Sequence, residues 1–300
     1  MIAALHLLVT LAMCTCAVRP LAGARWVWRA PRTGILLWQM LALTWVLSAV
    51  GLVLAIGLAP YDAPIPAALL RWGSDLAGGE PGPDSSPLHL AVVAFGLLLA
   101  LGFLAAFASS WVAVLRLRLR HRDLLALVAR EDSAVPGALV LDHPHAVAYC
   151  LPGTPSVVVL SSGALKSLSR DQVLAVLAHE QTHARERHDL VLLPFSALRR
   201  LAPGVRLVDS ALQAVALLVE MRADEGACRH QSAASLASAL RRFSTSAMRP
   251  PPGALGIADT AITARLLRMA GTRPLPSPAR WASLAFGLVM VSTPLSFMMF

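Results

Sequence analysis

The sequence has few charged residues for its length. Only 14% of its 300 residues are Asp, Glu, Lys or Arg, whereas 56% are hydrophobic. Soluble globular domains carry about 25% charged residues. The scarcity of charge therefore excludes an ordinary soluble protein, and together with a mean hydropathy of +0.63 it indicates a membrane protein.

Cysteine is also scarce, and no two cysteines stand at C-x-x-C spacing. Cys14 and Cys16 lie in an apolar segment, Cys150 in an expected strand and Cys228 near an expected helix end. This distribution excludes a zinc knuckle and gives no sign of a disulfide framework. We expect four free thiols, buried in the protein or facing lipid.

Charge is missing altogether from long stretches of the chain. No Asp, Glu, Lys or Arg occurs in residues 1–18, 34–58 or 281–300. A fourth stretch, 88–115, has His89 as its only ionisable side chain. A helix needs about 20 apolar residues to cross the hydrocarbon core. No basic residue precedes the first stretch, so it resembles an uncleaved helix more than a signal peptide. We therefore predict four transmembrane helices.

The basic residues predict how these helices are oriented. Residues 19–33 between the first two spans carry four arginines, and four more follow the third span. Residues 59–87 contain a single basic residue, Arg71. The positive-inside rule then places 19–33 in the cytoplasm, 59–87 in an extracytoplasmic loop and both chain termini outside a multi-pass cell-membrane protein. Because the net charge of +9 follows this pattern, we expect the lipid bilayer as a partner and no nucleic acid.

Residues 116–280 predict one cytoplasmic domain with mixed secondary structure. A capping box, Ser169-Arg-Asp-Gln172, begins a helix that is expected to end near Asp189. The fold class is thus a mainly α membrane protein with an α+β domain inserted between its third and fourth spans. In this domain the sequence predicts strands at 138–142, 147–150 and 156–160. It also predicts a helix at 116–130 and another that follows the motif helix and runs through Leu198. Two further helices are expected, at 205 to about 230 and at about 258–269.

The motif helix contains an H-E-x-x-H array, His179-Glu180-Gln181-Thr182-His183. Residues four apart share one face of a helix, so the two imidazoles can bind one metal ion while Glu180 lies close to a metal-bound water. This is the layout of a zinc hydrolase. A catalytic zinc site normally has three protein ligands, so a third ligand must come from elsewhere.

The best candidate for the third ligand is Glu220. Asp224 follows it by one helical turn and can accept the N–H of a ligand imidazole, which would fix the tautomer of that ring. Glu225 is the rival, but five residues correspond to a rotation of about 140°, so both glutamates cannot face one ion. Position 229, one turn after Glu225, is an arginine. We therefore expect one zinc ion held by His179, His183 and Glu220.

These motifs resemble the gluzincin-type integral-membrane peptidases. Three spans before the domain, one after it, and the Asp-ended tail of the motif (184–189) are most similar to the BlaR/MecR-type family, with HtpX-like peptidases more distant. The segments 141–153 and 157–165 resemble the edge-strand region of actinobacterial members. BlaR/MecR sensors carry a penicillin-binding domain after the last span, whereas this sequence ends at Phe300, so β-lactam sensing is not expected.

The resemblance implies a zinc-dependent endopeptidase at the cytoplasmic membrane face. Its substrate would be a protein or peptide, by resemblance a cytosolic transcriptional repressor cleaved in signal transduction. Glu180 would be the general base and Asp224 the orienting carboxylate. An extended substrate would lie along Val147, Ala148, Tyr149 and Cys150.

Two matters stay open from the sequence. The oxyanion or substrate contact could be Arg185, Arg187 or His188, although for His188 a solvated cation at a helix end is the simpler interpretation. The alternative function is a non-proteolytic membrane signalling or scaffold protein that keeps a structural zinc site.

Overall fold

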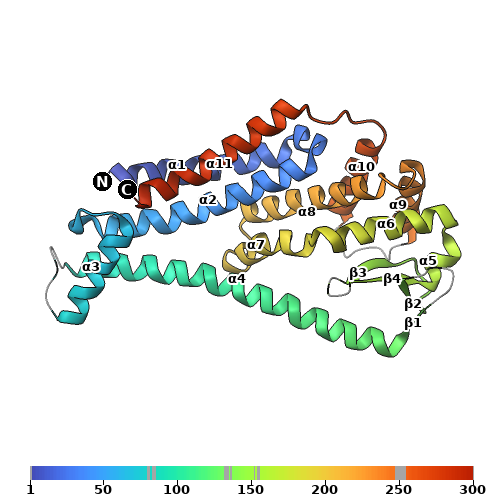
Figure 1. Cartoon of the computed structure of the whole chain (residues 1–300), viewed down its shortest axis with the longest axis horizontal. Helices are drawn as coiled ribbons and strands as arrows, with labels where there is room; N and C mark the ends of the chain where they lie inside the picture. Colours follow the sequence, from blue (N-terminus) through green and yellow to red (C-terminus); the bar gives the residue numbers. More distant parts are fainter. Residues whose placement is uncertain are drawn as a thin grey trace.

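The computed structural model describes residues 2–79, 82, 86–131, 135, 137–151, 153, 156–246 and 255–299, without the side chains of 244–246 and 255–260. The chain folds into an elongated, mostly helical body (Figure 1). Long helices fill one end, a small sheet with its helices forms the other, and the two termini lie side by side at the end away from the sheet.

Within the described ranges, four helices are long and apolar enough to cross a membrane, by length and composition. They contain most of the predicted spans, whose outermost residues Met1 and Phe300 lie outside the described part of the chain. The helices are α1 (Ile2–Gly23), α2 (Pro31–Gly57), α4 (Pro87–Val128) and α11 (Ser277–Met299). A short 3-10 helix, η1 (Arg25–Arg29), joins α1 to α2.

Helix α4 connects the two ends of the molecule. Its 42 residues correspond to about 63 Å, roughly twice the thickness of a hydrocarbon core. The arginine-rich segment after residue 115 continues the candidate span without a break, as the sequence predicts. This segment runs past α7 to the sheet (Figure 1) and ends directly at the first strand.

The loop between α2 and α4 contains structure that the sequence does not predict. A 3-10 turn, η2 (Ala59–Tyr61), leads into helix α3 (Ile65–Gly78). Ile65 and Ala68 are buried against Leu54, Leu58 and Val93 of the neighbouring segments. Helix α3 is therefore stabilised by packing of its apolar face against other segments. The Pro- and Gly-rich local sequence does not predict these contacts.

The described part of the chain forms one sheet of four strands in the order β1-β2-β4-β3. β2 and β4 are parallel, and the other two pairs are antiparallel. Among the described residues, β3 pairs only with β4, so it is an edge strand of this sheet. The strands are β1 (Ala129–Glu131), β2 (Ala138–Leu141), β3 (Ala148–Leu151) and β4 (Val157–Ser161). β1 is not predicted by the sequence, because its three residues follow α4 directly and carry no alternating pattern.

Helices cover the sheet and link it to the spanning helices. α6 begins with the predicted capping box, in which the Gln172 N–H donates to Ser169 Oγ and the Ser169 N–H to Gln172 Oε1. Its residues Val173 and Val176 pack on the sheet. The helices of this part are α5 (Ser162–Ser167), α6 (Arg170–Glu186), α7 (His188–Leu201), α8 (Arg206–Ala227), α9 (Ala233–Ser246) and α10 (Leu255–Met269), of which α5 and α9 are not predicted by the sequence.

Helix α8 anchors this part to the candidate membrane-spanning helices. Val215 and Leu218 are buried in one cluster with Ile35 and Trp38 of α2. The opposite region of α8 packs against α6. The position of α8, and of any group it carries, is thus fixed from both sides.

Candidate metal centre

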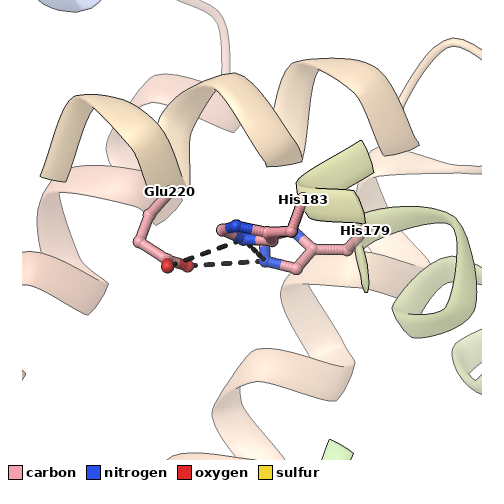
Figure 2. A group of neighbouring side chains, drawn as sticks. All are labelled: His179, His183 and Glu220. Carbon is pink, nitrogen blue, oxygen red and sulfur yellow. Dashed lines mark hydrogen bonds and ion pairs between the residues drawn. The ribbon is translucent and has the colours of Figure 1, made fainter. Parts of the chain in front are cut away.

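Three side chains from α6 and α8 converge on one point (Figure 2). His179 Nε2 and His183 Nε2 are 3.1 Å apart. Glu220 Oε2 lies 3.4 Å from His179 Nε2, and Glu220 Oε1 lies 3.6 Å from His183 Nε2. The structure thus brings together the two motif histidines and the carboxylate that the sequence favours.

These distances fit a tetrahedral zinc ion. Two ligand atoms that each lie ~2.0–2.1 Å from zinc at the tetrahedral angle are about 3.3–3.4 Å apart. The three observed separations lie between 3.1 and 3.6 Å. Two imidazole nitrogens and one carboxylate are also a ligand set found at catalytic zinc. The donor atoms are therefore already placed for one ion.

Asp224 lies behind His179. Its Oδ1 is 3.1 Å from His179 Nδ1, and the residue is 1% exposed. Burial by itself would lower the pKa of His179, but contacts with the carboxylates of Asp224 and Glu220 outweigh it and raise the pKa to about 9. The same contact holds Nε2 of this ring toward the metal position.

His183 is held from behind by another histidine. His188 Nδ1 lies 3.0 Å from His183 Nδ1, and His188 Nε2 lies 3.5 Å from Glu186 Oε2. Burial is the main cause that lowers the pKa of His183 to about 4. His188 is 3% exposed, so it does not suit the solvated helix-end cation that the sequence favours.

Arg265 of α10 completes the back of the site. Its Nε and one terminal nitrogen donate to the two carboxylate oxygens of Asp224 at 2.8 and 2.7 Å. Its other terminal nitrogen lies 2.9 Å from Glu220 Oε2. Burial is the largest effect on both acids and would raise their pKa values, but contacts with His179 and Arg265 reverse it. The pKa of Glu220 falls to about 2, so the carboxylate is ionised at neutral pH.

No motif in the sequence singles out Arg265. It lies 41 residues after Asp224, in a helix that no motif marks. Its only sequence signal is a cation in the otherwise uncharged stretch from Ala261 to Leu267, and such residues are usually solvent-exposed.

Glu180 stands next to both the metal ligands and the edge strand. The backbone N–H of Cys150 donates a hydrogen bond to its carboxylate, which tends to lower the pKa. Burial dominates, and the pKa of Glu180 is raised above its ordinary value. A carboxylate with a raised pKa is better matched to accepting and returning protons near neutral pH.

The segment that the sequence predicts to bind the substrate lies at the edge of the sheet. Ala148, Tyr149 and Cys150 belong to β3, and Val147 precedes it. β3 pairs with β4 on one side and packs against α6. Tyr149 Oη is 2.7 Å from His121 Nε2 of α4, which ties the strand to the long spanning helix.

The other predicted contacts lie away from the ligand set. Arg185 and Arg187 are exposed at the end of α6, where Arg185 reaches Thr182 Oγ1 at 3.5 Å. Arg187 has φ 50° and separates α6 from α7, so the expected continuous helix to Asp189 is interrupted two residues earlier. Glu225, the rejected ligand, contacts Arg222 and Arg268 instead.

Comparison with known proteins agrees with this geometry. Residues 116–254 match peptidase family M48. Peptidases of this family are zinc metalloproteases, so the match supports a metallopeptidase domain that carries the His179, His183 and Glu220 cluster. It does not distinguish the BlaR/MecR type within the family. No solved structure matches the chain.

The match to family M48 contains α6 and α8 but stops before Arg265. Within the matched region, the two ligand helices approach very closely at Gly226. A Cβ at this position would lie 2.4 Å from Thr182 Oγ1 and 2.5 Å from Thr182 Cγ2. The glycine is therefore needed for the close packing that brings Glu220 to the histidines.

We expect Gly226→Ala to destabilise the domain that contains α6 and α8 by about 1–3 kcal/mol, because overpacking forces the two helices apart. Zinc affinity should fall with it. The measurements are the thermal unfolding midpoint and the zinc content of the purified full chain. Gly73→Ala in α3 is the matched control, since nothing lies within 4 Å of its Cβ. Equal behaviour of the two variants would contradict the close-packing argument.

Proposed function

We propose that the protein is a membrane-bound zinc endopeptidase in which His179, His183 and Glu220 hold one zinc ion. The observation that carries the proposal is the near-tetrahedral spacing of the three donor atoms, 3.1 to 3.6 Å, with Glu180 beside them. When bound, zinc would supply a water of pKa near 7 and polarise the peptide carbonyl.

The protein groups then have separate tasks. Glu180 accepts the proton of the attacking water and returns it to the nitrogen of the leaving amine. Asp224 and His188 fix the orientation of the two ligand imidazoles through their Nδ1 atoms, and Arg265 fixes the two carboxylates. Partners of this kind typically change metal affinity or activity 10–100-fold when removed.

The substrate is proposed to be an extended protein segment that pairs with the free edge of β3. The Cys150 N–H already contacts Glu180, so a strand bound along β3 would bring its backbone to the catalytic carboxylate. A cytosolic transcriptional repressor remains the specific substrate that we propose from the sequence resemblance, which would give the protein a role in signal transduction.

Metal removal tests the proposal directly. Treating the purified full chain with 1,10-phenanthroline should abolish cleavage of an unfolded protein substrate such as casein, because the water nucleophile is no longer activated. Adding zinc should restore it, whereas magnesium, which prefers oxygen ligands, should not. Cleavage that persists after the zinc content has fallen to background would contradict the proposal.

We further propose that the peptidase site faces the cytoplasm and that both termini lie outside. The support is the arginine-rich connector between α1 and α2 and the arginines in the second half of α4. A topology reporter inserted after residue 75 should report from outside, and one inserted after residue 250 from the cytoplasm. The opposite pattern would reverse the assignment.

A further inference from the structure

A hollow of about 730 Å³ lies between η1 and α10, away from the metal site. Two tryptophans and three arginines line it, and no Asp or Glu is among its described lining residues. The lining comprises Arg25, Trp26, Trp28, Arg29, Thr263, Ala264, Leu267, Arg268 and Thr272. A cationic hollow of this kind suits an anionic group.

The walls of the hollow are fixed by hydrogen bonds. Arg29 Nε donates to the Arg273 carbonyl at 2.9 Å, and the Leu275 N–H donates to the Arg29 carbonyl at 3.1 Å. Arg268 Nε donates to the Trp28 carbonyl at 2.6 Å. The connector between α1 and α2 is thus tied both to α10 and to the segment before α11.

The charge in the hollow is only partly neutralised. Arg268 lies 3.3 Å from Glu225, whereas the hydrogen bonds of Arg29 go to carbonyl oxygens. Arg25 is exposed and has no carboxylate within ion-pair distance among the described residues. At least two arginines are therefore available to an anion.

The position of the hollow favours a lipid headgroup. η1 joins two candidate spans, α1 and α2, and the opposite wall leads directly into a third, α11. Residues at such junctions lie at the level of the headgroups, where Trp and Arg side chains are enriched. Arginines near an anionic membrane surface are attracted to its negative charge.

A second cavity shares the lining residue Trp26 with this hollow. Trp26 also lines an apolar groove of about 550 Å³ between α1, α2 and α11, three helices that lie side by side (Figure 1). Small and apolar side chains line the groove, among them Ala17, Leu37, Phe286 and Met290. A cationic hollow joined at one tryptophan to an apolar groove matches a phosphate headgroup with an attached acyl chain.

We propose that this pair of cavities is a binding site for an anionic phospholipid. The phosphate lies among Arg25, Arg29 and Arg268, and one acyl chain occupies the groove between α1, α2 and α11. The site is separate from the proposed peptidase centre, although α10 forms part of both through Arg268 and Arg265.

Native mass spectrometry of the detergent-solubilised full chain tests the proposal, with phosphatidylglycerol, phosphatidylcholine and inorganic phosphate as probes. We expect Arg25→Gln to weaken phosphatidylglycerol binding about tenfold, the loss expected for one charge-assisted hydrogen bond. Ala282→Phe, which fills the groove, should weaken both lipids and leave phosphate unaffected. Arg280→Gln is the matched control, because Arg280 is an exposed arginine at the start of α11 that does not line the hollow.

Thermal unfolding of each variant shows that it is folded. Equal phosphatidylglycerol binding by the Arg25 and Arg280 variants would overturn the site. A second outcome would also overturn the lipid assignment. In it, Arg25→Gln abolishes binding of inorganic phosphate, and the protein does not distinguish phosphatidylglycerol from phosphatidylcholine, which would show an anion site. Because binding is measured without peptide hydrolysis, these outcomes are independent of the proposed enzymatic function.

Discussion

Replacing Glu180 with Gln is expected to abolish peptide hydrolysis while zinc stays bound. The amide keeps the size and shape of the side chain but cannot take the proton of the attacking water. Proton transfer by a positioned side chain typically contributes 10²–10⁴-fold to the rate, and Glu180 is proposed to act in both water attack and amine departure. We therefore expect a loss of about 10³-fold or more.

The experiment compares two purified variants in the same detergent. Zinc content is measured by atomic absorption, and hydrolysis is followed with casein or with the chain itself as substrate. Asp171→Asn in the first turn of α6 is the matched control, because it makes the same acid-to-amide change on the same helix at an exposed position. It should retain both zinc and activity.

The same variant separates the two functions that the sequence allows. A scaffold protein with a structural zinc site predicts that Glu180→Gln is silent in cells, whereas His183→Ala lowers the abundance of the protein. Unchanged hydrolysis in the Glu180 variant would remove this residue from the general-base role. The position of Glu180 between the ligands and the Cys150 N–H favours the enzymatic function.

Replacing Arg265 with Gln should destabilise the domain by about 3–5 kcal/mol, the usual cost of removing one partner of a buried ion pair. Asp224 is 1% exposed and Arg265 8% exposed, so the carboxylate would lose its cation in a site that water does not reach. The contact of Arg265 with Glu220 is left out of this figure, because that carboxylate is 38% exposed. Zinc affinity should also fall as Asp224 and His179 lose their fixed geometry.

The measurements are the thermal unfolding midpoint and the zinc affinity of the full chain. Arg265→Lys keeps the charge but loses the two-pronged contact, so it should lie between wild type and Arg265→Gln. Arg199→Gln, an exposed position at the end of α7, serves as the control. An Arg265→Gln variant as stable as the control would show that Asp224 does not depend on this cation.

Local features of the sequence predicted a large part of the site. His179 and His183 share a face because four residues make one helical turn, and the capping box at Ser169 marks the start of that helix. The same periodicity favoured Glu220 over Glu225, and the structure has Glu220 at the histidines and Glu225 at Arg222 and Arg268. The apolar stretches likewise predicted the long helices, because span length follows from bilayer thickness.

The sequence by itself therefore determined the H-E-x-x-H motif, the third member of the candidate ligand set by helical phase, and the apolar segments around the domain. Only the tertiary structure decided what surrounds them. Arg265, His188 and the close approach at Gly226 depend on how α6, α8 and α10 pack, and segments some 40 residues apart leave no periodic signal for such contacts. The hollow between η1 and α10 likewise arises where two connectors meet in space.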